Sequence, residues 1–494
     1  MADLLDRRSL GSADPEAERP AYRPCDHGIG IVHLGLGAFH RAHQAVYTDT
    51  ALARAGGDWR IAGVSMRSSD IADALSKQDG LYTLLVRGPS AVRPRLIASL
   101  GEALSLGRDR DRVLSRLASA NTRIVSLTVT EKAYFFDAQR QSLDFEDPEV
   151  RADLEAPERP RTVPGLLVQA MRARRRAGTK GLSVLCCDNL PDNGRVVRRV
   201  VLDFAERADS GLADWISNNV AFPSTMVDRI TPRSIPADID EASALTGLRD
   251  AVPVGCEAFS QWVIEDSFAH GRPAWEEAGA VFVDDVTPYE EMKLRMLNGS
   301  HSLLAYAGHV AGLATIGECV GNAVLGRLLP AHLRMVSDGL PLLTGVDYAD
   351  YASQLVERFG NPGISHETYQ IAMDGSQKMP QRIFEPAMEA LERDMPVDSL
   401  VFATAAWMRY LLGVTEENAR YDLRDPKGPS ISRAIAGQTD ARSIIEALGS
   451  VEGLLPGRLF SHRMFVDAVA QTLDEILADG VLPTAKRVAD GLRH

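Results

Sequence analysis

The feature that most constrains the fold is an apolar run that ends in a glycine turn and leads into a helix. Residues 28–34 read GIGIVHL, residues 35–37 read GLG, and a helical pattern follows over about 39–55. Further β-rich runs lie at 59–67, 122–130 and 181–190, with helical stretches such as LLVQAMRARRRAG among them. Strands that alternate with helices predict a parallel sheet covered by helices. We therefore expect an α/β domain at the N-terminus.

From about residue 288 the pattern changes to helical periodicity, as in EEMKLRMLNGSHSLLAYAG and SLVFATAAWMRYLLGV. No convincing strand follows that point. We place a domain boundary near residue 285, which gives a Rossmann-like α/β domain at 1–285 and a mostly α-helical domain at 286–494. Residues 1–25 have no clear pattern and predict a disordered or loosely packed lead-in.

Composition and charge exclude several classes of protein. Hydrophobic residues make up 45% of the 494 and charged residues 24%, which is typical of globular domains. The net charge of −13 argues against a nucleic-acid or polybasic membrane surface. The longest apolar stretch, at 302–329, is interrupted by His309, Glu318 and Asn322, so it predicts buried helices and not a membrane span.

The cysteines and the N-terminus favour a cytoplasmic protein. The five cysteines are odd in number and form no CxxC or Cys/His metal spacing. This pattern fits a reduced protein better than a disulfide scaffold, and it predicts no metal site. The first twenty residues lack the apolar core of a secretory signal.

The glycine turn has two possible roles. Gly35 and Gly37 follow the first strand, and Ala38, Phe39 and His40 open the helix. Such a turn lets a backbone approach a pyrophosphate closely, which favours a dinucleotide site. However, His40 stands where the GxGxxG fingerprint has its third glycine, and a GxG after a strand can also be a plain structural turn.

The residue that selects the cofactor should follow the second strand. Asp70, in RSSD, is the candidate, because an acid there accepts from ribose hydroxyls and repels a 2′-phosphate. It favours NAD over NADP, although Arg67 could accommodate a phosphate. The alternative is that Asp70 caps the helix that follows.

The stretch KLRMLNGSHS places three polar residues in an otherwise apolar helix. On an α-helix that starts at Lys293, Asn298 lies at about 140° and His301 at about 80°, so all three share one side. A buried lysine has a lowered pKa and can act as a general base, and an amide can stabilise a developing alkoxide. The alternative is a solvated lysine, a helix end at the asparagine and a core histidine.

These residues, and blocks in the same order elsewhere, resemble one known family. MKLRMLNGSHS is similar to the signature of the mannitol dehydrogenase family of polyol-specific long-chain dehydrogenases/reductases. The blocks IVHLGLGAFHRAHQAVYTD, IVSLTVTEKAY, CDNLPDNG, MVDRITP, QWVIEDSFAHGRPAW, PYEEMK and IAMDGSQKMPQR also match. The resemblance covers roughly residues 28–480, and its many separate blocks make it specific.

The resemblance implies roles for the polar residues of that helix and its neighbours. Lys293 would be the general acid/base, and Asn298 with Asn189 would stabilise the oxyanion. His301 would bind and orient the substrate, and Glu290 would help to relay protons. These enzymes work without a metal, so the N-terminal domain would bind NAD and the helical domain would hold substrate and catalytic residues.

The remaining pocket residues follow from the matching blocks. Lys378 corresponds to a substrate-pocket lysine, Asp228 and Arg229 lie in a substrate block, and Glu131 lies in a cofactor block. A histidine in place of the third glycine is normal for this family, and NAD-preferring members have an acid where Asp70 stands.

Two positions bear on the substrate. Lys132 replaces a glycine that mannitol-type members tend to have, and Gln370 replaces an arginine. Both differences resemble the fructuronate reductase branch, which acts on D-fructuronate and D-mannonate, and a carboxylate in the substrate calls for an extra cation. Lys132 could equally be a solvated side chain, and the loop RSSD resembles the mannitol type.

Several alternatives therefore remain. They are a mannitol 2-dehydrogenase, a tagaturonate reductase, an arabinitol dehydrogenase or a catalytically silent NAD-binding sensor. We expect a cytoplasmic enzyme, most simply a monomer, that binds a small sugar acid or polyol and no nucleic acid or membrane.

Overall fold

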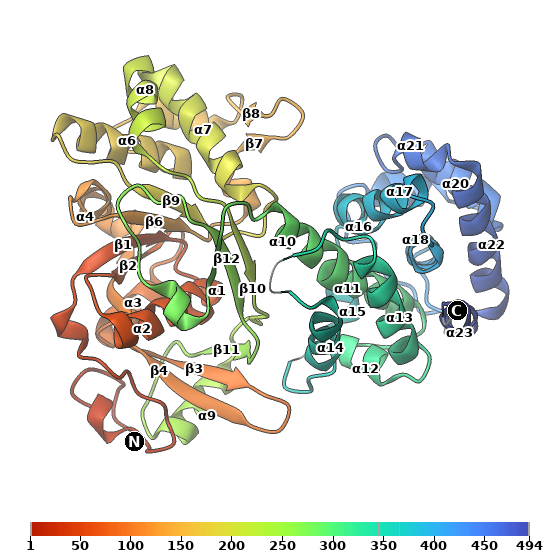
Figure 1. The fold of residues 1–494 in the computed structure, drawn as a ribbon, viewed down its shortest axis with the longest axis horizontal. Helices are drawn as coiled ribbons and strands as arrows, with labels where there is room; N and C mark the ends of the chain where they lie inside the picture. The colour runs from red at the N-terminus through yellow and green to blue at the C-terminus, as the bar shows by residue number, and fades with distance from the viewer. Residues whose placement is uncertain (1, 344–345, 365, 493–494) are drawn as a thin grey trace. The chain divides into compact units, whose positions relative to one another are not determined.

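The computed structural model describes residues 2–343, 346–364 and 366–492. It divides into two compact units, Met1–Thr287 and Pro288–His494 (Figure 1). The division lies close to the boundary expected near residue 285. The first unit contains all the strands of the described residues, and the second is built from helices.

A five-stranded parallel sheet forms the centre of the first unit. Its strand order is β5 (Leu100–Ser105), β2 (Arg60–Ser65), β1 (Ile29–Leu34), β6 (Ile124–Leu127) and β9 (Ser183–Cys186). The strand order reverses between β1 and β6, because the chain runs outward from β1 first in one direction and then in the other. This topology is Rossmann-like, as expected, and ligands of such sheets bind at the carboxyl ends of the strands near the reversal.

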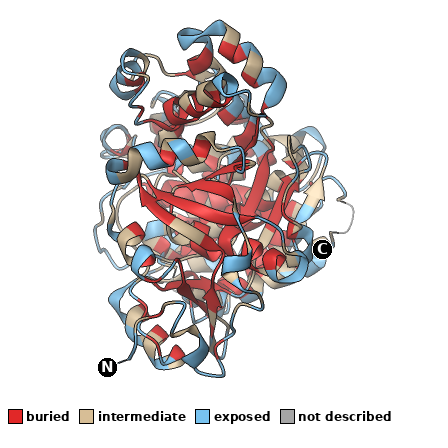
Figure 2. Ribbon diagram, turned by 90° about the vertical axis from the view of Figure 1, so that its left-hand side faces the viewer, coloured by how far each residue is buried: buried red, intermediate tan, exposed pale blue. Residues whose placement is uncertain are grey.

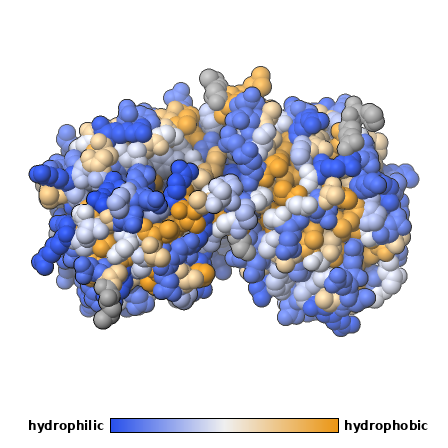
Figure 3. Space-filling view, turned by 90° about the horizontal axis from the view of Figure 1, so that it is seen from below, coloured by the Kyte–Doolittle hydropathy of each residue, from blue (hydrophilic) through white to orange (hydrophobic). Residues whose placement is uncertain are grey.

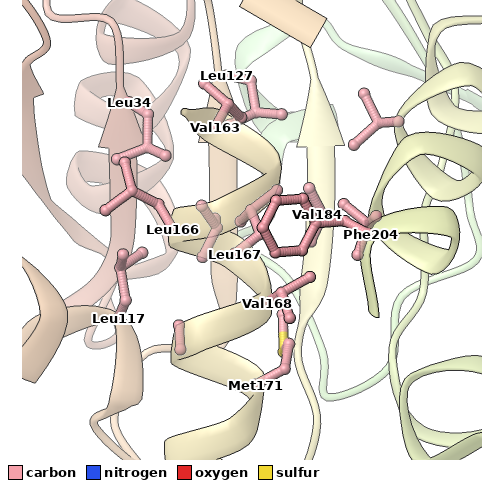
Figure 4. Packing of buried hydrophobic residues seen from close by; sticks show 14 of the residues in the cluster. Leu34, Leu117, Leu127, Val163, Leu166, Leu167, Val168, Met171, Val184 and Phe204 are labelled. Carbon is pink, nitrogen blue, oxygen red and sulfur yellow. The ribbon is translucent and has the colours of Figure 1, made fainter. Parts of the chain in front are cut away.

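Side chains that alternate along the strands point to opposite faces of the sheet, and each face packs against a layer of helices. Val32 and Leu34 of β1 pack into one cluster together with Leu166 of α6 (Val163–Arg176), which Figure 4 shows from close by. Ile31 points to the opposite face and packs with Leu52 of α2 (Gln44–Ala55). A strand buried on both faces is apolar along most of its length, which explains the nearly continuous apolar runs of the sequence. Figure 2 shows buried residues along the whole sheet.

Helices from several parts of the chain cover these two faces. Leu117 of α4 (Leu106–Ala118) and Val200 of α7 (Asn193–Ala208) join the cluster of Leu34, and Leu75 of α3 (Asp70–Lys77) joins the cluster of Ile31. The other helices of the first unit that have five or more residues are α1 (Ala38–Ala42), α3 (Asp70–Lys77), α4 (Leu106–Ala118), α5 (Pro148–Glu155), α7 (Asn193–Ala208), α8 (Ser210–Asn219) and α9 (Pro236–Thr246).

Smaller sheets flank the parallel one and were not predicted. β11 (Val254–Glu257), β3 (Tyr82–Arg87) and β4 (Val92–Ile97) form one three-stranded sheet. The second three-stranded sheet contains β10 (Thr225–Asp228), β12 (Gln261–Glu265) and β13 (Val281–Val283), and a hairpin joins β7 (Phe136–Asp137) to β8 (Ser142–Leu143).

The N-terminal segment is packed more closely than we expected. Leu5 is fully buried in a cluster with Leu81 and Leu96, and its backbone amide donates to the carbonyl of Arg249. The hydroxyl of Tyr22 donates to Asp49 at 2.8 Å. The prediction of a loose lead-in was wrong, because the apolar residues that anchor this segment lie too far apart to form a periodic pattern.

The second unit packs its helices around α11 (Ser300–Val310) and α18 (Asp398–Tyr410), where every residue of α18 from Ser399 to Tyr410 is buried. The stretch at 302–329 forms most of α11 and then α12 (Ile316–Gly321) and the start of α13 (Leu325–Ser337). The other helices are α10 (Thr287–Met292), α14 (Tyr348–Phe359), α15 (Thr368–Ile371), α16 (Gly375–Met379), α17 (Glu385–Glu392), α19 (Gly428–Ala434), α20 (Ala441–Gly449), α21 (Gly457–Phe460), α22 (Arg463–Asp479) and α23 (Val481–Gly491).

The surface is mixed in polarity. The face in Figure 3 carries many hydrophilic side chains with smaller apolar patches among them. In the described part of the chain, no helix is long and apolar enough to cross a membrane.

Candidate active site

The two glycines after β1 have different tasks. Gly35 has a φ of +105°, and a Cβ there would overlap the carbonyl of Thr128, so only glycine fits the turn. At Gly37 the nearest atom to an added Cβ is the carbonyl oxygen of Gly35, 3.7 Å away. Gly35 therefore allows the tight turn. Gly37 leaves space beside the backbone at the carboxyl end of the central strand. The open cradle at the strand-order reversal fits a dinucleotide.

His40 packs beneath this turn. Its ring is fully buried and stacks on His33 of β1 at 3.4 Å between ring centroids, with 12° between the planes. The ring of His33 is held by Ser126 Oγ at 2.8 Å and Thr128 Oγ1 at 2.9 Å. Burial lowers the pKa of His40 well below its usual value, so the ring is neutral. A flat, uncharged ring thus provides the close helix–sheet contact that a third glycine usually permits.

The helix after the turn is shorter than expected. Ala38 and Phe39 begin α1, which ends at Ala42, and α2 begins at Gln44. Between them His43 has a φ of −121° and a ψ of −95°, which breaks the helix. The continuous helix predicted over about 39–55 was therefore wrong, because its periodicity runs across the break.

Asp70 is the exposed first residue of α3, after the end of β2 at Ser65. The N-cap position belongs to Ser69, so Asp70 does not have the capping role considered for it. Ser68 Oγ donates to its Oδ2 at 2.7 Å. The choice of NAD by this carboxylate stays a prediction.

Three further predicted residues lie on two neighbouring loops at the same edge of the sheet. Glu131 and Lys132 are exposed on a short 3-10 helix, Glu131–Tyr134, after β6. Asn189 is exposed after β9. Leu127 pairs with Cys186 at the ends of these parallel strands, so both loops start at the same level of the sheet.

Asp228 and Arg229 lie at the end of β10. Asp228 is buried. The guanidinium of Arg229 donates to the carbonyls of Ala42, at 2.6 Å, and Glu257, at 3.0 and 3.2 Å. These bonds join α1 to β11, and they give Arg229 a part in holding the turn region together. Substrate binding by these two residues stays a prediction.

In the second unit, the stretch KLRMLNG is not an α-helix. Lys293–Gly299 is a π-helical segment between α10 and α11. The prediction of 100° per residue was wrong here, because a π-helix bonds residue i to i+5 and so has a wider turn. Residues five apart then lie nearly one above the other, which places Lys293 and Asn298 on the same side. Single π-helical turns inside α-helices are rare and are frequent at functional sites.

A second π-helical segment, Pro380–Phe384, packs against the first. Nη1 of Arg382 donates to Ser302 Oγ at 3.2 Å and lies 3.5 Å from the carbonyl oxygen of Asn298. A Cβ at Gly299 would come within 3.1 Å of the Arg382 carbonyl oxygen. The absence of a side chain at position 299 therefore allows the two segments to approach closely.

The side chains of the first segment lie in an apolar environment. Lys293 is 9% exposed and Asn298 is 7% exposed, beside the fully buried Met292 and Met296. Nδ2 of Asn298 is buried and has no hydrogen-bond partner among the described residues. A buried amide donor of this kind costs free energy and is suited to a ligand oxygen.

His301 lies one turn further on, in α11. Its ring stacks on Phe359 at 4.3 Å and meets the edge of His366 at 5.4 Å. Its Nε2 is buried without a partner within the described ranges. Burial first, and then the nearby His366 and the cations Arg382, Arg358 and Lys378, lower the pKa of His301 well below its usual value. The ring is therefore a neutral hydrogen-bonding group.

Arg358, Lys378 and Arg382 bring three positively charged side chains near His301. Arg358, in α14, is 7% exposed, and Nζ of Lys378, in α16, donates to the carbonyl of Ile371 at 3.2 Å. We name Arg358, Lys378 and Arg382 the cationic group. Sequence reasoning found only Lys378, because the three lie on separate helical segments.

The structure places the two remaining predicted residues as follows. Glu290, in α10, precedes Lys293 by three residues and is partly buried. Gln370 is exposed in α15. In the described part of the chain, no three His, Cys, Asp or Glu side chains are grouped so that they could hold a metal ion.

Comparison with known proteins adds to this geometry. A model of the mannitol dehydrogenase Rossmann domain matches residues 29–277, and a model of the mannitol dehydrogenase C-terminal domain matches residues 285–477. The D-mannonate oxidoreductase of Escherichia coli (strain K12) is 41% identical over 476 residues, which cover 94% of this chain and 97% of that protein. A mannitol 2-dehydrogenase of Pyricularia oryzae is 36% identical over 498 residues, which cover 98% of each.

One solved structure is similar over nearly the whole chain. It is the Pseudomonas fluorescens mannitol 2-dehydrogenase in a ternary complex with NAD and D-mannitol. The TM-score is 0.85 and the sequence identity 37%, with 98% of this chain and 99% of that chain covered.

Proposed function

Since the chain belongs to the mannitol dehydrogenase family and is an oxidoreductase, we propose that it is an NAD-dependent dehydrogenase of sugar acids. The proposed reaction is the interconversion of D-fructuronate and D-mannonate. The cofactor is proposed from the open cradle at Gly37 and from the NAD complex of the Pseudomonas relative. Bound NADH supplies the hydride in the reductive direction, and NAD accepts it in the other.

The observation that carries the choice of substrate is the cationic group around His301. Arg358, Lys378 and Arg382 all lie close enough to His301 to depress its pKa. A carboxylate forms strong charge-assisted hydrogen bonds with guanidinium groups, whereas the hydroxyls of a neutral polyol form weaker ones. The cationic group therefore favours a sugar acid over a sugar alcohol.

The side chains of the second unit have distinct tasks in this proposal. Lys293 gives a proton to the carbonyl oxygen during reduction and removes it during oxidation. Nδ2 of Asn298 donates to that oxygen as negative charge develops on it, and because it has no partner among the described residues it is available to do so. Neutral His301 orients the substrate through Nε2. Asn189 stays the predicted second donor, and Glu290 the predicted proton relay.

A second candidate is a mannitol 2-dehydrogenase. It is supported by the 36% identical Pyricularia protein and by the Pseudomonas structure, whose complex contains D-mannitol. The exposed Gln370 and Lys132 do not separate the two candidates.

A substrate panel tests the proposal. The purified protein is mixed with NADH and with D-fructuronate, D-tagaturonate or D-fructose, and the absorbance of NADH is followed. We expect the highest kcat/KM with D-fructuronate. Turnover of D-fructose alone would refute the sugar-acid assignment and favour the second candidate. NADH binding without turnover of any of the three would favour a non-catalytic sensor.

A further inference from the structure

Asp188 precedes the predicted donor Asn189, and its carboxylate binds the neighbouring loop. Oδ2 accepts from the backbone amide of Val129 at 3.0 Å, and Oδ1 accepts from that of Thr130 at 3.0 Å. Oδ2 also accepts from the hydroxyl of Tyr134 at 2.5 Å. One carboxylate thus holds both ends of the segment Thr130–Tyr134, which carries Glu131 and Lys132.

The segment needs such a restraint. Thr130 has a φ of 78° and a ψ of 150°, a region of backbone space that is occupied almost only by glycine. A non-glycine residue stays there only when its surroundings enforce it, and strained residues of this kind cluster at functional sites. The hydrogen bond from the Thr130 amide to Asp188 Oδ1 holds this backbone in place.

Asp188 is itself anchored from the other side. Its carbonyl accepts from Leu190 N at 2.9 Å and from Asn193 Nδ2 at 3.2 Å. Asn193 in turn exchanges two hydrogen bonds with the backbone of Thr225, at 2.7 and 3.0 Å. The position of Asp188 is therefore set by the start of α7 and by β10, and the loop after β6 is held to that frame.

We propose that Asp188 is a positioning residue that holds Glu131, Lys132 and Asn189 in one arrangement for the cofactor and the substrate. In this proposal Asp188 acts through the loop that it restrains. Burial raises the pKa of its carboxyl, and the three donors oppose that rise by stabilising the carboxylate. This inference rests on the proposed function, since the three positioned residues are those predicted for it.

The test uses Asp188→Asn, which keeps the shape but turns one acceptor oxygen into an amide donor. We expect faster hydrogen exchange at the amide of Val129 or of Thr130, whichever faces the new NH₂ group and so loses its acceptor. We also expect NADH to bind on the order of 10- to 100-fold more weakly, because the charge-assisted bonds that fix the loop are lost. The whole protein is used, and NADH binding is followed by fluorescence titration without any turnover.

A second substitution separates positioning from general stability. Adding Thr130→Gly removes the conformational strain, so the double variant should regain part of the NADH affinity that Asp188→Asn loses. Asp153→Asn is the matched control, because the carboxylate of Asp153 also holds a turn by accepting from three donors, the amides of Arg161 and Thr162 and the hydroxyl of Thr162. It should lower the melting temperature and leave NADH affinity unchanged.

Tyr134→Phe is a milder variant in case Asp188→Asn does not fold. It removes a single bond to Asp188 and should weaken NADH binding less. Unchanged exchange at Val129 and Thr130 in Asp188→Asn, or faster exchange with unchanged NADH affinity, would overturn the inference. A wild-type protein that does not bind NADH would instead refute the proposed function, and the exchange data would still decide whether Asp188 restrains the loop.

Discussion

Arg382 donates to Ser302 Oγ at 3.2 Å, and this bond ties the second π-helical segment to the helix that continues from the first. The same guanidinium lies 3.5 Å from the carbonyl oxygen of Asn298. Arg382 therefore brings a positive charge close to the backbone of Asn298, whose side chain is the proposed oxyanion donor.

Replacing Arg382 should change specificity more than catalysis. Arg382→Met removes a cation and keeps most of the side-chain volume, so we expect KM for D-fructuronate to rise on the order of 10- to 100-fold, since a charge-assisted bond is lost. The rate with a neutral ketose such as D-fructose should change little. Arg393→Met is the matched control, because Arg393 donates to the carbonyl of Gly339 on the exposed surface. Equal losses with both substrates would contradict the role of the cationic group.

Asn298→Leu should lower the activity and raise the stability of the protein. The substitution removes a buried donor that has no partner among the described residues and keeps a similar shape. We expect stability to rise by about 1 kcal/mol and kcat to fall on the order of 10²- to 10³-fold, as for loss of an oxyanion donor. Thermal unfolding and initial rates measure the two effects.

Ser300→Ala is the control for this variant. The hydroxyl of Ser300 is also buried without a partner in the described residues, and no role is proposed for it. It should raise stability without loss of rate. If Asn298→Leu kept full activity, Asn298 would not be the donor.

The cofactor preference should depend on Asp70. We expect the wild type to prefer NADH, and Asp70→Ala to lower the ratio of kcat/KM for NADH to that for NADPH on the order of 10-fold or more. Asp73→Ala, one turn along the same helix, makes the same change in net charge. Equal rates with both cofactors in the wild type would discredit Asp70 as the selector.

Buried histidines should make the second unit sensitive to acid. His332 of α13 is fully buried beside Ser399, and burial lowers its pKa to about 4. The unfolded chain, with a histidine pKa of about 6.5, binds this proton between pH 6.5 and 4 while the folded protein does not. Stability must therefore fall as the pH falls through this window, by about 1.4 kcal/mol per pH unit for one such histidine.

His332→Gln tests this contribution. Glutamine can still bond to Ser399 but does not titrate, so urea unfolding of the variant should depend less steeply on pH between 6.5 and 4. An unchanged slope would contradict the account of His332. His366 has a pKa lowered to about 4 as well, so some acid sensitivity should remain.

The sequence predicted the elements that follow simple periodic or turn chemistry. The apolar run before Gly35, the runs that form β6 and β9, and the change to helices near 288 all express the packing of buried strands and helices. The buried polar residues Lys293 and Asn298 also stood out, because they interrupt an apolar pattern.

Features that depend on contacts between distant segments were not predicted. A π-helical turn differs from an α-helical one by about one residue, so its pattern in a short stretch looks α-helical. The residues of the cationic group lie on separate segments of the chain. The stack of His33 on His40 could not be predicted because His33 is part of an apolar strand pattern that gives no sign of the contact. Asp188 stands in a matched block, but its bonds to Val129 and Thr130 exist only once β6 and β9 lie side by side.

The central claim is that Lys293 exchanges the proton, and one comparison tests it most directly. NADH consumption with D-fructuronate is measured for the wild type, for Lys293→Met and for Arg295→Met. Arg295→Met is the control, because it makes the same change in charge on the same π-helical segment, where Arg295 pairs with Glu389. In the oxidative direction, the wild-type rate should rise with pH, because neutral lysine is the base. We predict a loss on the order of 10²- to 10⁴-fold for Lys293→Met alone, with NADH affinity unchanged. A Lys293→Met variant that kept the rate and the pH profile of the wild type would contradict the account.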